Sequence, residues 1–362
     1  MRATQLTLFL AGLLPGTTST VSAATGKDFR VWYPEYAPVF EELLDTTCAT
    51  EYATWAEGNR ATFDFSNGTA TTGEAVVQCL LTSTSEFMKT NMASAAVLLG
   101  IMPFALSVLG SSSEESALLY VISRRPLLTT LLLAGAPVVV ALRPFEYKDP
   151  YLIIQSRERR FHSLRLGPKW LILVLEYGLA LASVANVVHV TYQLGAGVTT
   201  MILPEASYLP GLWAATGILV HVIGALCLKS RLRLISPKRE SMLRSEFTLS
   251  SSKNITVETV EETKLFLALS WLTSTSTTFH VIFGTLAFSS MQFISVKDAF
   301  GVIGRYTASV TLCRVVVMYE LSGLISTVES TSEGTGVSIT NGQAGGESVI
   351  KQKVNKVFTF AP

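Results

Sequence analysis

Long apolar segments separated by polar connections dominate this chain. The apolar segments are 92–109, 126–142, 170–192, 208–228, 265–290 and 300–328. A helix needs about 20 residues to cross a bilayer. The last four segments meet that length, whereas the first two are shorter and contain Pro103 and Pro137. The pattern predicts an all-α fold, a polytopic helical membrane protein with its transmembrane domain in residues 91–328.

The connections between these segments differ in charge. Connections 143–169 and 229–264 hold seven and eight Lys or Arg residues, whereas 193–207 holds none. Basic connections mark the cytoplasmic side of a membrane protein. If the N-terminus is outside, this bias requires an odd number of crossings before residue 143. We therefore predict five transmembrane helices, with only one of the two short segments crossing. Six crossings with a lumenal tail are the alternative.

The N-terminus has the three parts of a secretory signal peptide. Arg2 supplies the positive start, residues 6–14 an apolar core, and Val21-Ser22-Ala23 a cleavage site. Residues 1–23 are therefore predicted to be a signal peptide and 24–90 an extracytoplasmic segment. The expected destination is a membrane of the secretory pathway, most simply the plasma membrane.

Two amphipathic helices are expected in the extracytoplasmic segment, over 37–45 and 73–90. The sequon at Asn67 predicts a glycosylation site on this side. Cys48 and Cys79 also lie here, and an oxidising lumen favours a disulfide between them. Cys227 and Cys313 lie in apolar segments and are expected to be free thiols.

Residues 329–362 are rich in Ser, Thr and Gly, which predicts a disordered cytoplasmic tail. Within the tail, 348–360 partly alternates apolar and polar residues. The segment 247–260 has similar β-prone character. Pairing of these two segments on the cytoplasmic side is the alternative to full disorder.

Ionisable residues inside apolar segments are costly and are functional candidates by default. The candidate intramembrane polar site consists of Glu176, His189, His221, His280, Arg314 and Glu320. Arg305 also lies in an apolar segment and can extend to the outer interface. Structural packing, a proton or ion path, and a metal or haem site are the three interpretations. No helix carries a His-x-x-x-His pair, and we expect no cofactor and no metal.

The sequence carries no catalytic or nucleotide-binding motif, so we expect no enzyme activity. A non-enzymatic interaction, sensor-like or organising component is the first hypothesis. A transporter or channel is the alternative, and it requires Glu176, His280 and Arg314 to meet in one water-filled cavity. We expect the basic connections to contact the lipid bilayer, including anionic lipid at its cytoplasmic face, rather than to bind nucleic acid.

One block of the chain contains five short motifs: Cys79-Leu80-Leu81, NMASAAVLLG at 91–100, LGSS at 109–112, RRPLL at 124–128 and FEYKDP at 145–150. This block resembles an uncharacterised family of multi-pass membrane proteins from filamentous fungi. It covers about a fifth of the chain. The resemblance implies a fungal source and a lumenal cysteine-containing segment, and it implies no activity or site residue.

Overall fold

The computed structural model describes residues 27–57, 72–140, 168–235, 242–250, 255–260, 262–324, 328–329 and 357–360. The predicted signal peptide, the Asn67 sequon, nearly all of the basic connection 143–169 and most of the tail lie outside the described residues. The chain divides into two compact units. Unit 1 holds Met1–Leu98, Tyr192–Gly211 and Ala287–Ala299, and unit 2 holds Leu99–Thr191, Leu212–Leu286 and Phe300–Pro362.

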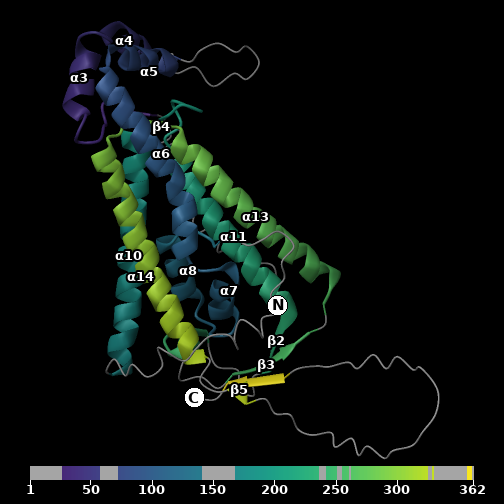
Figure 1. Ribbon diagram of the computed structural model, residues 1–362. Helices are drawn as coiled ribbons and strands as arrows, with labels where there is room; N and C mark the ends of the chain where they lie inside the picture. The colour runs from purple at the N-terminus through teal and green to yellow at the C-terminus, as the bar shows by residue number, and fades with distance from the viewer. Residues whose placement is uncertain are drawn as a thin grey trace, which may run out of the picture. The chain divides into compact units, whose positions relative to one another are not determined.

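Five helices are long and apolar enough to cross a membrane, which confirms the predicted number among the described residues. They are α6 (Glu86–Leu109), α10 (Lys169–Gly197), α11 (Leu209–Arg231), α13 (Lys264–Ser289) and α14 (Val296–Leu324) (Figure 1). Each of the five has residues in both units. The chain is therefore built as a multi-pass membrane protein.

The second short apolar segment does not form a spanning helix. It gives α8 (Pro126–Gly135), whose ten residues are about 15 Å long. Pro137 follows directly, and proline cannot continue a helix because it lacks the N–H and clashes with the preceding turn. The helix α7 (Ser113–Val121), which the sequence did not predict, precedes it. Both short helices lie beside the long helices of unit 2 (Figure 1).

The core of unit 2 is formed by the two short helices and three long ones. Leu119 of α7, Leu128 and Leu132 of α8, Ala180 of α10 and Val316 of α14 are buried together. The two predicted free thiols are confirmed, with Cys313 buried and Cys227 half-buried. The surface of α8 is mostly apolar. Packing against other helices removes this surface from water, so α8 need not cross the membrane.

In the described residues of unit 1, three short helices precede α6. The predicted helix over 37–45 is α3 (Ala37–Asp45), and α4 (Ala49–Ala56) follows it without having been predicted. The predicted helix over 73–90 is interrupted: α5 (Thr72–Ser83) ends before α6 begins at Glu86. Cys48 and Cys79 have Cα atoms 5.9 Å apart and sulfur atoms at bonding distance, so the fold brings the predicted pair together.

An aromatic core joins these helices to the connections between the long helices. Phe293, from the α13–α14 connection, lies 5.3 Å from Trp32 and 5.1 Å from Phe40 between ring centroids. The same connection forms β4 (Met291–Gln292), which pairs with β1 (Thr199–Thr200) of the α10–α11 connection. Residues 27–57 and 72–98 and these two connections therefore form one packed body.

Unit 2 ends in a four-stranded antiparallel sheet with the order β2-β3-β6-β5. Its strands are β2 (Leu232–Ile235), β3 (Ile255–Thr259), β5 (Val328–Glu329) and β6 (Val357–Phe360). The pairing of 247–260 with the tail, which was the alternative to full disorder, is confirmed, because Val257 pairs with Phe358. The part of the chain that the structure describes is thus mostly helical, with two small sheets.

Candidate functional site

Arg125 is the centre of a buried charge network in unit 2. It stands directly before α8, and its side chain is fully buried. Its Nη1 lies 2.8 Å from Oε2 of Glu176 and 2.8 Å from Oε2 of Glu320. Arg125, which was not among the candidates, therefore brings together two of the six predicted site residues, Glu176 on α10 and Glu320 on α14. Burial acts to lower the pKa of Arg125, but the charges of Glu320 and Glu176 outweigh it and raise that pKa.

Glu246, from α12 (Met242–Glu246), extends this network to the start of α8. Its carboxylate accepts hydrogen bonds from the backbone N–H groups of Leu127 at 3.1 Å and Leu128 at 2.9 Å. The hydroxyl of Tyr177 donates to the same carboxylate at 2.7 Å. The first N–H groups of a helix lack partners inside the helix. Arg125, the N-cap residue, gives no side-chain cap, so Glu246 supplies it from a distant segment.

The carboxylate of Glu320, the second one bonded to Arg125, accepts hydrogen bonds from further donors. The hydroxyl of Ser250 donates to Oε2 of Glu320, and the backbone N–H of Ser250 donates to it at 3.4 Å. The same hydroxyl lies 2.9 Å from that of Ser123. In contrast, Oε1 of Glu176 and Nη2 of Arg125 are buried and have no hydrogen-bond partner among the described residues. Within that part of the chain, the network therefore contains one unused acceptor atom and one unused donor atom.

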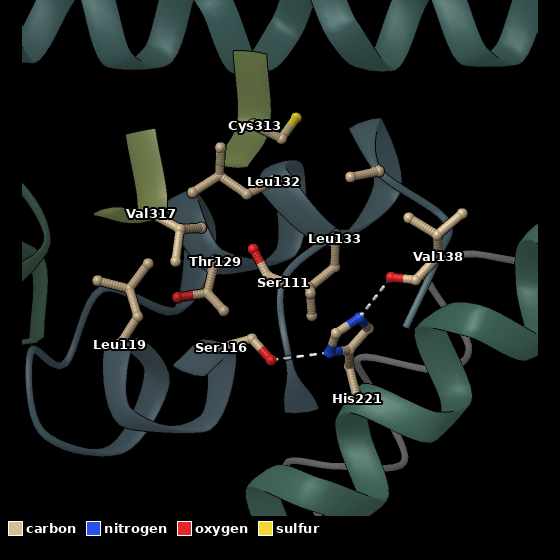
Figure 2. Close-up of a pocket in the computed structure, with 11 residues that line it drawn as sticks. Ser111, Ser116, Leu119, Thr129, Leu132, Leu133, Val138, His221, Cys313 and Val317 are labelled. Carbon is tan, nitrogen blue, oxygen red and sulfur yellow. Dashed lines mark hydrogen bonds between the residues drawn. The ribbon is translucent and has the colours of Figure 1, made fainter. Parts of the chain in front are cut away.

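His221 lies between a serine hydroxyl and a backbone carbonyl group. Figure 2 shows its ring between Ser116 and Val138. Nδ1 lies 2.7 Å from Oγ of Ser116, and Nε2 lies 3.2 Å from the carbonyl oxygen of Val138. Because the carbonyl accepts only, Nε2 carries the proton and Nδ1 accepts from the hydroxyl. The histidine thereby joins α11 to α7 and to the chain after α8.

The cavity beside this serine–histidine pair is lined mostly by apolar side chains, including Leu132 and Val317 (Figure 2). It has room for about one water molecule. The hydroxyl of Ser116 also lies 3.2 and 3.1 Å from the carbonyl oxygens of Ser112 and Ser113, one turn earlier. The arrangement is therefore that of a structural contact, because the cavity is too small for an organic substrate.

His280 lies in a different contact. Its Nδ1 is 3.0 Å from Oγ1 of Thr216, and its ring stacks on Trp213 with centroids 5.3 Å apart and an interplanar angle of 10°. The hydroxyl run before it bonds back to carbonyls four residues earlier, as Thr277 does to Thr273. These contacts join α13 to α11.

His189 and Arg305 form a pair on the exposed surface of unit 2. Nη2 of Arg305 lies 3.0 Å from Nδ1 of His189, and Nε donates to Oδ1 of Asn186 at 2.9 Å. Asn186 returns a hydrogen bond from Nδ2 to the backbone oxygen of Arg305 at 2.9 Å. These bonds join α10 to α14.

Arg314 pairs with Glu115, the residue that closes the capping box of α7 with Ser112. The ion pair therefore fastens α14 to the start of α7. Glu115 was not among the predicted site residues, because it lies in a polar connection rather than in an apolar segment.

The structure distributes the predicted polar site over five places. Only Glu176 and Glu320 share a partner, while His189, His221, His280 and Arg314 each have a different one. Within the described ranges, no group of three His, Cys, Asp or Glu side chains is arranged to hold a metal ion. The sequence missed Arg125, Tyr177, Glu246 and Ser250. The one signal for Arg125 was a charged pair, Arg124-Arg125, beside an apolar segment.

Comparison with known proteins adds no relative: no family model, no curated protein and no solved structure matches the chain.

Proposed function

We propose that this chain is a non-enzymatic, sensor-like or organising component of a membrane of the secretory pathway, most simply the plasma membrane. The observation that carries the proposal is the packing of the N-terminal segment onto the connections between long helices. Nζ of Lys297, at the start of α14, lies 2.9 Å from Oε2 of Glu35. The backbone N–H of Gly73 donates to Oε1 of Glu205, in the α10–α11 connection, at 3.1 Å. A partner bound to this segment would therefore act directly on the ends of the spanning helices.

The orientation follows from charge and from the cysteine pair. The signal peptide and the acidic composition of residues 24–90 support an extracytoplasmic position for unit 1, with Cys48 and Cys79 oxidised and Asn67 glycosylated. Connections 143–169 and 229–264 then face the cytoplasm and its anionic lipids. The resemblance described above supports a fungal source.

The exposed acids of α3 indicate a partner with a basic surface. Glu41 and Glu42 are both exposed on this helix. Proximity labelling in native membranes compares the full chain with the charge-reversed variant E41K/E42K. The control is E86K, which reverses an exposed acid at the start of α6. Loss of a specific partner in E41K/E42K alone supports the proposal. An identical set of partners for all three proteins contradicts it.

A transporter or channel is the second candidate, favoured by the charge network around Arg125 in the membrane-spanning part of the chain. The specific form we expected needs Glu176, His280 and Arg314 in one cavity, and these side chains have three different sets of partners. Ion or substrate flux into proteoliposomes that stops in E176Q would favour this candidate over the first.

A further inference from the structure

Glu176 and Glu320 place two carboxyl groups on a single guanidinium nitrogen. Each Oε2 lies 2.8 Å from Nη1 of Arg125, so the two oxygens are at most twice that distance apart. The three side chains are 4%, 1% and 0% exposed. Two buried carboxyl groups this close cannot both ionise without strong repulsion, and such pairs retain a proton. We infer that Glu176 and Glu320 bind one exchangeable proton between them, held beside Arg125.

The charges of the network support a single proton. The third acid, Glu246, contacts Arg125 only through its backbone oxygen, and its carboxylate uses other donors. One guanidinium therefore faces two carboxyl groups, and one proton makes the group neutral. Among the described residues, Tyr319 also faces the pair, and Tyr177 faces Arg125 and Glu246; a tyrosine brings no charge at neutral pH.

The hydrogen bonds show which carboxyl group holds the proton. Glu320 accepts from the hydroxyl and the backbone N–H of Ser250, and these bonds favour a carboxylate. Oε1 of Glu176 is buried and has no donor among the described residues, so a carboxylate at Glu176 would have only the bond from Arg125 to Oε2, fewer donors than Glu320 has. The proton therefore resides on Glu176.

Polar atoms continue from the carboxyl pair on one side. From Glu320 they lead to Ser250 and then Ser123, with 2.9 Å between the two hydroxyl oxygens. Both serines are buried, and Ser250 lies in the connection between α11 and α13, which carries five basic residues. The two hydroxyl groups therefore extend the polar contacts of the pair toward that connection. The inference goes beyond the proposed function, since it requires no outer partner.

Infrared difference spectroscopy of the purified full chain tests this inference. A protonated carboxyl group has a carbonyl stretch that a carboxylate lacks, and the stretch shifts in D₂O. We expect E176Q to lose one such band at neutral pH. We expect E320Q to lose the same band, because Glu176 alone would ionise against Arg125. The matched control, E86Q, alters an exposed acid and should leave the band unchanged.

Three results would overturn the inference. One is a spectrum in which E176Q loses only carboxylate bands. Another is a band lost in E176Q but kept in E320Q, because the proton would then not be shared. The third is a band that does not diminish when the wild-type protein is titrated to alkaline pH, because the proton would not exchange. If E320Q fails to fold, E176Q and the titration of wild-type protein decide the matter.

Discussion

The carboxylate of Glu246 accepts a hydrogen bond from the backbone N–H of Leu128 at 2.9 Å, across 118 positions of the chain. A residue in the basic connection between α11 and α13 thus caps a short helix buried in unit 2. The cap serves two purposes, because the start of a helix carries a partial positive charge as well as unused N–H groups. The position of the connection and the stability of α8 are therefore linked.

Replacing Glu246 with Ala should destabilise the protein by about 1–2 kcal/mol, the usual effect of removing a helix cap. The side chain is 4% exposed, so water cannot readily replace it. Chemical unfolding in mixed micelles measures the loss. Glu262→Ala is the control, because that carboxylate is exposed and pairs with Arg231 in a surface ion pair worth about 0–1 kcal/mol. Equal effects in the two variants would show that the cap is unimportant.

Arg125→Met should be more damaging than either single acid substitution. It leaves Glu176 and Glu320 buried without their cation, and removing one partner of a buried ion pair costs about 3–5 kcal/mol. The double variant R125M/E320Q should recover part of the loss, since it removes one of the stranded acids. Unfolding midpoints of R125M, E176Q, E320Q and R125M/E320Q measure this. A double variant less stable than R125M would contradict the assigned network.

The sequence predicted the long helices because hydropathy over 20 or more residues is a strong signal. It also indicated why 126–142 differs, since Pro137 follows only ten helical residues. The pairing of β3 with β6 was visible in the alternation of apolar and polar residues. Local patterns of this kind require no knowledge of distant contacts, so the sequence alone suffices for them.

The charge network was not predictable because its members meet only in the fold. Arg125 lies 51 positions from Glu176, and no local pattern relates them. Arg124 and Arg125 are chemically identical neighbours, yet only Arg125 is fully buried. The difference arises from the backbone: Arg124 adopts a left-handed φ of 52° between α7 and α8, which redirects the chain. Such a conformation is rare outside glycine and left no signal in the sequence.

Lys27 should make unit 1 sensitive to pH. Its Nζ donates to the backbone oxygens of Ala196 and Val31 and lies 4.6 Å from the ring centroid of Trp32. Burial lowers the pKa of Lys27 to about 7, against a smaller opposing effect of Asp28. Between this value and the ordinary lysine pKa, the unfolded chain binds more protons than the folded chain. Stability should therefore rise with pH above about 7, by up to about 1.4 kcal/mol per unit, and be independent of Lys27 below it.

The measurement is thermal unfolding from pH 6 to about pH 9, compared between the wild-type protein and K27M. The neutral methionine fills a similar volume and removes the titration, so the wild-type protein should gain stability relative to K27M as the pH rises above about 7. Lys89→Met provides the control, because Lys89 pairs with Glu86 near the surface. A wild-type curve parallel to that of K27M would contradict the role assigned to Lys27.

Two sequons test the orientation within one chain. Asn67 lies in the segment expected outside, and Asn254 in the basic connection 229–264 expected in the cytoplasm. Glycosylation occurs only on the lumenal side, so five crossings predict sugar on Asn67 and none on Asn254. Mass spectrometry of glycopeptides from the native membrane measures both sites, and N67Q should remove the entire shift in mass. Sugar on Asn254 would place the whole connection 229–264, with its eight basic residues, on the lumenal side. That result would favour the model with six crossings and a lumenal tail.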